Sequence, residues 1–282
     1  MPTLSETSPV TIPLLVAAKA VERIAMLTAY DAPSATLLDS AGVDVLLVGD
    51  SVEMAVYGEP NTLSATMDSM IRHSRAVSRA VKRALVVGDM PFLSYQTDTA
   101  RAVENAGRFL AAGGCAAVKL EGGIRSLPAI EAILAADIPV MGHVGLTPQS
   151  YHKLGGFKVQ GREPANAREI REDAKALADA GCFAIVLECV PAALAAEITR
   201  EVPVPTIGIG AGASCDGQVL VFHDVMGLTR DLRPRFVRRY ADLSTTIEEA
   251  AKAFTRDVRD GSFPSAEESF SSGKATTLRR VY

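Results

Sequence analysis

Short apolar runs recur along the chain, and four of them end in a carboxylate. The acids that follow these runs are Asp50, Asp89, Glu121 and Glu188. An apolar run without polar alternation is typical of a strand buried on both faces, as in a parallel sheet. Because α/β folds place their chemistry at the carboxyl ends of such strands, these four acids are candidate site residues.

Segments with helical periodicity separate the apolar runs. The regions expected to form strands are 23–31 with its turn, 46–50, 84–89, 116–121, 138–143, 184–188, 204–208 and 219–223. The helices between them are expected to begin at Pro33, Thr66, Thr97 or Asp98, Ser126, an Asn166-x-x-Glu169 capping box and Pro191. One strand and one helix per about 30 residues is the spacing of a (β/α)8 TIM barrel. An open doubly wound sheet is the alternative, and the barrel is favoured because a closed ring brings acids of separate strands together.

The rest of the chain completes a single-domain α/β organisation. We expect a short N-terminal helical segment over 1–22, the catalytic barrel with its C-terminal helix over 23–260, and an extended or disordered tail over 261–282. Residues 52–64 and 144–165 are aperiodic and are expected to form functional loops at the carboxyl ends of strands. The C-terminal helix is expected over 232–260, with candidate packing positions Phe236, Tyr240, Ile247, Ala251 and Phe254.

Composition excludes several classes of protein. The chain has 282 residues, 48% of them hydrophobic, a net charge of -4 and no tryptophan, which disfavours binding to nucleic acid or to an anionic membrane. The apolar stretch 12–18 is too short to span a bilayer and has no basic residue before it, so a signal peptide or membrane anchor is not expected. Cys115, Cys182, Cys189 and Cys215 form no C-x-x-C pair, and they are expected to be buried free thiols of a cytoplasmic protein.

Asp50 and Asp89 each follow a glycine at the end of an apolar strand. Taken singly, either aspartate is more typical of a helix cap or a solvated loop. Together they place two carboxylates at the ends of neighbouring strands. Hard oxygen ligands of this kind suit Mg²⁺, which takes one or two protein carboxylates and leaves positions for water and substrate.

Lys119 and Glu121 are two positions apart on one strand and therefore point to the same face. A lysine inside an apolar strand needs a partner, because an unpaired buried ammonium group is costly. A structural ion pair with one of the acids is one interpretation. The preferred hypothesis is that Lys119 holds an anionic substrate while Glu121 helps to bind the metal.

Glu188 differs from the other acids in having apolar neighbours on both sides along the chain. Apolar surroundings raise the pKa of a carboxyl group, which suits a general base near neutral pH, although a salt bridge to an unseen arginine is the alternative. His143 is the histidine that ends a strand, and it either orients substrate, relays a proton or has a structural role. The match of Gly208–Ala213 to a dinucleotide-binding motif is interpreted as false, because a turn follows it instead of a helix.

Six motifs carry a resemblance to a known family. They are Thr28-Ala29-Tyr30-Asp31, Leu47-Val48-Gly49-Asp50-Ser51, Val118-Lys119-Leu120-Glu121-Gly122-Gly123, Gly142-His143-Val144-Gly145-Leu146-Thr147-Pro148-Gln149-Ser150, Leu187-Glu188-Cys189-Val190-Pro191 and Gly208-Ile209-Gly210-Ala211-Gly212. Their order and spacing resemble the 3-methyl-2-oxobutanoate hydroxymethyltransferase family, also called ketopantoate hydroxymethyltransferases, from Leu15 to Phe270.

The resemblance implies a Mg²⁺-dependent barrel enzyme of pantothenate biosynthesis. Such an enzyme transfers a hydroxymethyl group from 5,10-methylenetetrahydrofolate to 3-methyl-2-oxobutanoate, giving 2-dehydropantoate. The implied roles are metal binding for Asp50, Asp89 and Glu121, keto-acid binding for Asp50, Ser51, Asp89 and Lys119, and proton acceptance for Glu188. A large cytoplasmic homo-oligomer, specifically a decamer, is also implied.

Three departures from the family pattern concern the loop after the second strand and the C-terminus. Glu53 and Met54 stand where small residues are usual, Ser64 stands where proline is common, and the tail beyond Phe270 is long. Two alternative functions stay open. One is a Mg²⁺-dependent carbon–carbon lyase or phosphomutase of the related phosphoenolpyruvate-type barrels, and the other is a metabolite-binding scaffold without catalysis.

Overall fold

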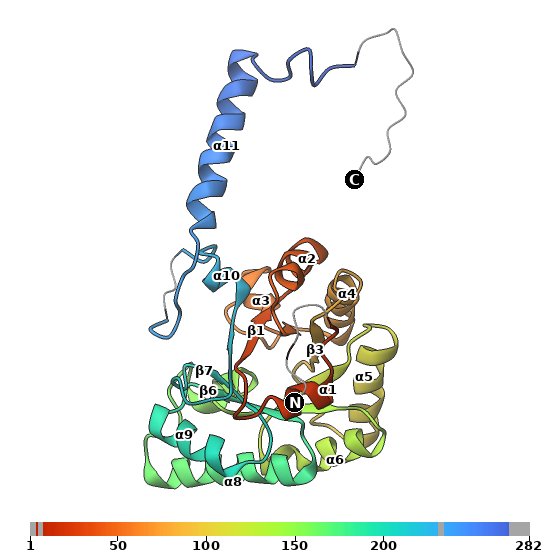
Figure 1. Cartoon of the computed structure of the whole chain (residues 1–282), viewed down its shortest axis with the longest axis vertical. Helices are drawn as coiled ribbons and strands as arrows, with labels where there is room; N and C mark the ends of the chain where they lie inside the picture. The colour runs from red at the N-terminus through yellow and green to blue at the C-terminus, as the bar shows by residue number, and fades with distance from the viewer. Residues whose placement is uncertain (1–3, 5–7, 231–233, 271–282) are drawn as a thin grey trace.

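A closed barrel of eight parallel strands forms the centre of the computed structural model, which describes residues 4, 8–230 and 234–270 (Figure 1). The strands are β1 (Ile24–Thr28), β2 (Val45–Val48), β3 (Leu85–Asp89), β4 (Ala117–Glu121), β5 (Val140–Gly145), β6 (Ala184–Glu188), β7 (Thr206–Ile209) and β8 (Gly217–Leu220). Each strand pairs with the next one in the sequence, and β8 closes the ring against β1. The predicted (β/α)8 barrel is therefore confirmed, and the open doubly wound sheet is wrong.

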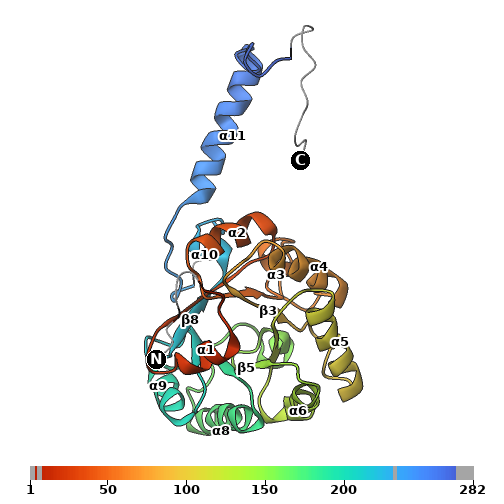
Figure 2. The same ribbon diagram turned by 45° about the vertical axis from the view of Figure 1, so that its right-hand side comes forward.

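Helices surround the barrel, as Figure 2 shows for α4, α5, α6, α8 and α9. The helices are α1 (Ile12–Ala17), α2 (Ala32–Ser40), α3 (Val52–Ala55), α4 (Met67–Ser78), α5 (Thr99–Ala111), α6 (Leu127–Ala135), α7 (Tyr151–Leu154), α8 (Pro164–Ala180), α9 (Ala192–Glu201), α10 (Phe222–Val225) and α11 (Leu243–Asp260), with short 3₁₀ turns at Ile124–Ser126 and Pro148–Ser150. Thr66 and Asp98 cap α4 and α5 through their side chains, as predicted. Within the described ranges, no helix combines the length and hydropathy needed to cross a bilayer.

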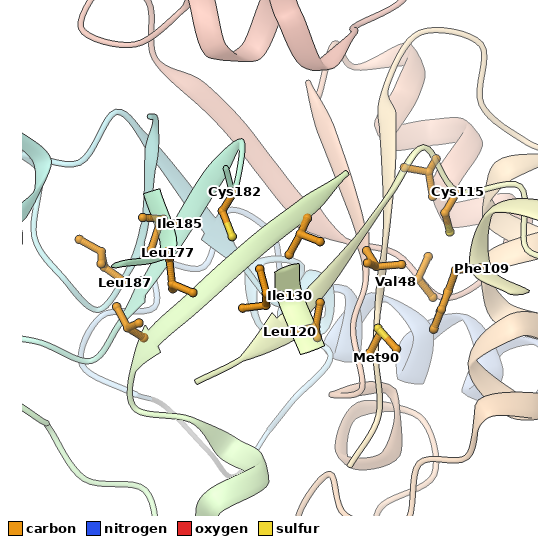
Figure 3. Close-up of a cluster of buried hydrophobic side chains, with 14 of the residues drawn as sticks. Val48, Met90, Phe109, Cys115, Leu120, Ile130, Leu177, Cys182, Ile185 and Leu187 are labelled. Atoms are coloured by element: carbon orange, nitrogen blue, oxygen red, sulfur yellow. The ribbon is translucent and has the colours of Figure 1, made fainter. Parts of the chain in front are cut away.

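Two hydrophobic cores follow from the alternation of side chains along the strands. One core fills the barrel, where Met26, Val87 and Met141 are buried together, and Leu15 of α1 packs into it from the N-terminal segment. The other lies between the strands and the helices, and Figure 3 shows part of it around Leu120 and Ile130. Alternate side chains of each strand therefore point into the barrel. Those in the middle of the strands fill its core, and the next inward-pointing ones toward the carboxyl ends reach its open end.

Gly88 has a packing role that sequence reasoning did not assign. A Cβ atom at this position would lie 2.2 Å from Cδ1 of Phe109, a fully buried residue of α5. The glycine therefore lets α5 pack closely on β3, and it sets Asp89 directly at the end of a strand held tightly to its helix.

Several predicted boundaries are wrong at the carboxyl ends of the strands. The segment 52–64 begins with helix α3, and the segment 144–165 contains a 3₁₀ turn and α7. Ser126 is at the N-cap position of α6 as predicted, but its hydroxyl donates to the carbonyl of Glu121 over 2.9 Å rather than capping the helix. Short helical turns without amphipathic periodicity leave little signal in the sequence.

Two further elements begin elsewhere than expected. Helix α8 begins at Pro164 rather than at a capping box, because proline is well suited to the first turn, and Asn166 instead accepts a hydrogen bond from the backbone N–H of Gly161 over 2.5 Å. Strand β8 begins at Gly217, where a Cβ atom would lie 2.6 Å from the carbonyl oxygen of Ile24. The residue is thus part of the strand, where a close approach of backbones requires glycine, rather than of a turn.

The C-terminal helix is shorter than predicted and stands apart from the barrel. Helix α11 begins at Leu243, so Phe236 and Tyr240 precede it, and residues 231–233 lie outside the described residues. Both Figure 1 and Figure 2 show α11 extending away from the barrel, and it has no buried residue. Ile247 and Phe254 are 56% and 57% exposed rather than packed. The tail has no helix or strand over 262–270, and 271–282 lie outside the described residues.

Candidate active site

All seven predicted site residues line one cavity of about 510 Å³ at the carboxyl end of the barrel. They are Asp50, Ser51, Asp89, Lys119, Glu121, His143 and Glu188. The strand register explains this convergence, because Asp89 pairs with Lys119 and Glu121 pairs with His143 on neighbouring strands. Six of these residues were predicted from the ends of strands, and Ser51 was implied by the family resemblance.

Asp89 and Lys119 form the central ion pair of the cavity. The Lys119 Nζ donates to Asp89 Oδ1 over 2.6 Å, and the other Asp89 oxygen accepts a hydrogen bond from the backbone N–H of Asp50 over 3.2 Å. Both side chains are almost completely buried, with 5% of Lys119 and 3% of Asp89 exposed. The structural ion pair considered for Lys119 is therefore present, and it lies inside the candidate site.

Gln149 connects the acids and is a residue that sequence reasoning did not single out. Its side-chain Nε2 donates to Asp50 Oδ2 over 3.0 Å, and its backbone N–H donates to Glu121 Oε2 over 2.9 Å. The hydroxyl of buried Tyr95 donates to Gln149 Oε1 over 2.8 Å, which fixes the orientation of the amide. It lies in the 3₁₀ turn Pro148–Ser150 beyond the end of β5, so the position of strand ends in the sequence does not identify it.

Negative charge exceeds positive charge on the cavity floor. Asp50, Asp89 and Glu121 are buried together with Lys119 as their cation. Burial, reinforced by the charge of Asp89, raises the pKa of Asp50 to about 7, and burial also raises the pKa of Glu121 well above its usual range. Burial acts to lower the pKa of Lys119, but the surrounding carboxylates outweigh this and raise it. The floor therefore holds a protonated amine and carboxyl groups that favour an additional cation.

The donor set of the floor fits Mg²⁺. The three carboxyl groups are hard oxygen ligands, and the raised pKa values of Asp50 and Glu121 follow from burial first and from neighbouring negative charge second. Among the described residues, no group of three acidic, histidine or cysteine side chains is placed to hold a metal ion. Mg²⁺ takes only one or two protein carboxylates and keeps its other positions for water and substrate, so its fit depends on the hard oxygen donors of the floor.

His143 and Glu188 form the opposite side of the floor. The His143 Nε2 lies 3.3 Å from Glu188 Oε2, and its Nδ1 lies 3.7 Å from Glu121 Oε1. Within the described chain, neither ring nitrogen has a partner with hydrogen-bond geometry. Burial, together with the charge of Lys119, lowers the pKa of His143, so the imidazole is neutral at neutral pH. Glu188 is 17% exposed and is thus the more open of the site carboxylates.

The structure also bears on Ser51, on the glycine-rich segment after β7 and on the four cysteines. Ser51 is held by a hydrogen bond of 2.8 Å between its Oγ and the hydroxyl of Tyr30, which sequence reasoning had not assigned. The glycine-rich segment after β7 leads into β8 without a helix, as predicted. All four cysteines are free and buried, also as predicted.

A closed parallel barrel with a buried acidic cluster, a lysine and a histidine at the carboxyl ends of its strands defines the class of (β/α)8-barrel enzymes. The family model of ketopantoate hydroxymethyltransferase matches residues 9–266. The chain therefore belongs to the ketopantoate hydroxymethyltransferase family and is an enzyme of the hydroxymethyltransferase class.

Individual relatives agree with this assignment. The 3-methyl-2-oxobutanoate hydroxymethyltransferase of Carboxydothermus hydrogenoformans is 54% identical, over 93% of this chain and 94% of the relative. The protein of the same name from Moorella thermoacetica is 56% identical, over 95% of this chain and all (100%) of the relative. The similarity thus extends along nearly the whole of each chain.

More distant solved structures share the fold. The crystal structure of a phosphonopyruvate hydrolase complex with oxalate and Mg²⁺ superposes with a TM-score of 0.59 at 16% identity, covering 92% of this chain and 93% of that one. A 2,3-dimethylmalate lyase superposes with a TM-score of 0.57 at 16% identity, covering 96% and 93% of the two chains. At this level of identity, the likeness concerns the barrel architecture.

Proposed function

We propose that this enzyme transfers a hydroxymethyl group from 5,10-methylenetetrahydrofolate to 3-methyl-2-oxobutanoate, giving 2-dehydropantoate in pantothenate biosynthesis. The observation that carries the proposal is the cavity floor, where the acids Asp50, Asp89 and Glu121 surround Lys119 while Glu188 stands on the other side. Relatives that match over nearly the full chain carry the name of this activity, which supports the choice of keto acid.

The keto acid is held by charge and by hydrogen bonds. Its carboxylate binds at Lys119, whose ammonium group is buried and already aligned by Asp89 Oδ1. The Ser51 hydroxyl, held by Tyr30, donates a hydrogen bond to the substrate oxygens. Asp50, Asp89 and Glu121 would hold Mg²⁺, with Gln149 fixing the orientation of Asp50 and Glu121. When bound, Mg²⁺ offsets the negative charge that develops on the keto oxygen as the C3 proton leaves.

Glu188 accepts the C3 proton, since the other site carboxylates are engaged by Lys119, Gln149 or the metal. The neutral imidazole of His143, 3.3 Å from Glu188 Oε2, orients this carboxylate and the substrate. A carbon–carbon bond then forms between C3 and the methylene carbon, and a carbon–oxygen bond forms between that carbon and water, as its two bonds to the folate nitrogens break. The folate nitrogens take up the proton held by Glu188 and one proton of the water, and tetrahydrofolate leaves.

One experiment tests this proposal directly. Turnover is measured with 3-methyl-2-oxobutanoate, 5,10-methylenetetrahydrofolate and Mg²⁺, and each component is omitted in turn. We expect 2-dehydropantoate only when all three are present. Folate-independent cleavage or rearrangement of a 2-oxo acid would favour the lyase or phosphomutase alternative, for which the solved neighbours supply only a shared fold.

The proposal includes a cytoplasmic homo-oligomer, specifically a decamer. Helix α11 supports it, because its exposed Ile247, Phe254 and Val258 give an isolated helix an apolar surface that a second copy of the chain would cover. Light scattering or sedimentation of the full chain measures the mass. Removing residues 243–282 is expected to lower it.

A further inference from the structure

Thr62 lines the floor of the active-site cavity with a buried hydroxyl group. The residue is only 2% exposed. Within the described part of the chain, the buried polar atoms of the cavity wall that lack a hydrogen-bond partner are Thr62 Oγ1 and the two ring nitrogens of His143. Because a buried hydroxyl without a partner costs free energy, such a group needs an explanation. At Thr62 the explanation we expect is a molecule that enters the cavity and supplies the partner.

Thr62 lies on the Asp50 side of the floor. Burial raises the pKa of Asp50, and the Thr62 hydroxyl is close enough to act in the opposite direction, although it makes no hydrogen bond to the carboxylate. Asp50 Oδ2 already accepts a hydrogen bond from Gln149. The ammonium group of Lys119 pairs with Asp89 instead. Thr62 and Lys119 therefore offer hydrogen-bond donors at two different points of the floor.

The loop after β2 fixes the position of Thr62. The backbone N–H of Ala65 donates to the Thr62 carbonyl over 3.2 Å. The Ser64 hydroxyl donates to the buried carboxylate of Glu53, which belongs to α3 and lies two residues after Ser51. The two ends of the loop are thus tied together, and the hydroxyls of Ser51 and Thr62 line the same cavity. A hydroxyl held in this way loses little freedom when it binds a ligand.

The keto acid of the proposed function needs hydrogen-bond donors, because its carboxylate and keto groups contain only acceptor oxygens. The carboxyl groups of the floor suit a cation rather than these oxygens. In the proposed function, Lys119 binds the substrate carboxylate and Ser51 supplies one hydroxyl. Thr62 supplies a second hydroxyl, away from Lys119 and therefore on the side of the keto group.

We infer that Thr62 is a further substrate-binding residue, whose hydroxyl donates a hydrogen bond to the keto oxygen of the 2-oxo acid, an inference that rests on the proposed function. Negative charge develops on this oxygen as the C3 proton leaves. The hydrogen bond then becomes charge-assisted and strengthens. It therefore lowers the barrier to proton removal more than it raises the affinity for the keto acid.

Exchange of the C3 hydrogen with deuterated solvent tests this role on the full-length enzyme with Mg²⁺ and saturating 3-methyl-2-oxobutanoate. Thr62→Val replaces the hydroxyl by a methyl group of similar size and is expected to slow the exchange by about 10- to 100-fold. Thr62→Ala is expected to slow it as strongly, whereas Thr62→Ser keeps the hydroxyl and should retain most of the parent rate. Parent-like exchange in both the valine and the alanine variants would overturn the assignment.

Calorimetry distinguishes binding of the keto acid from binding of the metal. In Thr62→Val with saturating Mg²⁺, the affinity for 3-methyl-2-oxobutanoate is expected to fall by a smaller factor than the exchange rate, because the hydrogen bond strengthens only as charge develops. The affinity for Mg²⁺ alone, without keto acid, should stay at the parent value. A loss of affinity for Mg²⁺ alone would place the hydroxyl on the metal's water and overturn its placement on the keto oxygen.

Urea unfolding of the metal-free enzyme distinguishes a binding role from a structural one. Thr62→Val removes a buried hydroxyl without a partner, so the free energy of unfolding is expected to be unchanged or higher. Ser74→Ala is the matched control, because Ser74 Oγ is fully buried on α4 and also lacks a partner within the described ranges. This control should exchange the C3 hydrogen at the parent rate. A Thr62→Val variant that is less stable as well as slower would indicate a structural role and overturn the inference.

The outcomes separate an error about Thr62 from an error about the proposed function. If the parent exchanges the C3 hydrogen and Thr62→Val exchanges it equally fast, Thr62 is wrongly assigned while the proposed function stands. If the parent does not exchange the C3 hydrogen at all, the proposed chemistry is wrong, and the role of Thr62 in it is overturned as well.

Discussion

Aspartates at the two ends of the barrel have different hydrogen-bond partners and opposite pKa shifts. At the amino ends of the strands, Asp216 accepts hydrogen bonds from Thr206 N over 2.9 Å and from Lys19 Nζ over 3.0 Å. Asp39 accepts from three consecutive backbone N–H groups that lead into β3. Burial acts to raise the pKa of both carboxyls, but these donors outweigh it and lower each pKa.

At the carboxyl ends, which form the mouth of the barrel, Asp89 is paired with Lys119, but Asp50 is not satisfied in this way. The pKa of Asp50 is raised to about 7, by burial first and by the charge of Asp89 second. We propose that this difference separates acids that stabilise the fold from acids that serve the chemistry. The amino-end acids stabilise the fold, whereas the acids at the mouth would keep a concentration of negative charge that a bound cation relieves.

The largest effect is expected from Glu188, the most exposed of the site carboxylates. Glu188→Gln keeps shape and hydrogen bonding but cannot accept a proton, so we expect exchange of the C3 hydrogen with deuterated solvent to slow by about 10²- to 10⁴-fold. NMR follows this exchange with keto acid and Mg²⁺ and without folate. Glu197→Gln, an exposed acid on α9, is the matched control and should exchange at the parent rate. Parent-like exchange in Glu188→Gln would assign the base elsewhere, with His143 the next candidate.

The next largest effect is expected from replacing Lys119, the cation at the mouth of the barrel. Lys119→Ala removes the partner of Asp89 and the anchor of the substrate carboxylate, so the keto-acid KM is expected to rise by about 30-fold or more. The KM for 5,10-methylenetetrahydrofolate should change far less. Steady-state kinetics with each substrate varied in turn separates the two constants. Equal increases in both would contradict the placement of the keto acid at Lys119.

Two Asp→Asn substitutions, one at each end of the barrel, test the difference between the ends through the free energy of unfolding. Asp216→Asn is expected to lower the free energy of unfolding by about 1.5–3 kcal/mol, because it removes a charged acceptor from the pair with Lys19. Asp50→Asn should leave the free energy of unfolding of the metal-free enzyme unchanged or higher, because it removes one of several like charges. Urea unfolding in the presence of EDTA measures both. Equal destabilisation by the two variants would remove the distinction between the two ends.

A smaller effect is expected in the pH dependence of stability. An unfolded aspartate titrates near pH 4, and the folded Asp50 titrates at about 7, so the folded state binds more protons between these values. The contribution of Asp50 therefore decreases the free energy of unfolding as the pH rises from about 4 to about 7. Asp39 and Asp216 act in the opposite sense, since their stabilisation is lost as the pH falls below about 4. In EDTA, Asp50→Asn should show a shallower decrease than the parent; the same slope in both would contradict the raised pKa.

Much of the fold and of the cavity floor could be predicted because both depend on the alternation of inward- and outward-pointing side chains along the strands. Lys119 and Glu121 face inward since they continue the alternation that buries Ala117 inside the barrel. Gln149 and Tyr95 could not be predicted in this way, because they reach the floor from loops whose path depends on tertiary contacts.

Contacts within the loop after β2 could not be predicted either, because they too depend on how the loop folds. Glu53 and Ser64, two departures from the family pattern, contact each other, with Ser64 Oγ donating to Glu53 Oε2 over 2.9 Å. Each residue could be noted separately from the sequence, but their contact depends on α3 and on how the loop folds back. The exposed position of α11 could not be predicted either, because its apolar spacing is that of a packed helix.

We propose that the acids at the mouth, unlike those at the amino ends of the strands, hold Mg²⁺ for the keto acid. Calorimetric titration of the metal-free enzyme with Mg²⁺, in the presence of 3-methyl-2-oxobutanoate, tests it with Asp50→Asn, Asp89→Asn and the amino-end control Asp39→Asn. We expect Mg²⁺ affinity to fall at least about tenfold in the two mouth variants, in line with the loss of a metal ligand, and to stay at the parent value in the control. Parent-like Mg²⁺ binding in both Asp50→Asn and Asp89→Asn would contradict the claim.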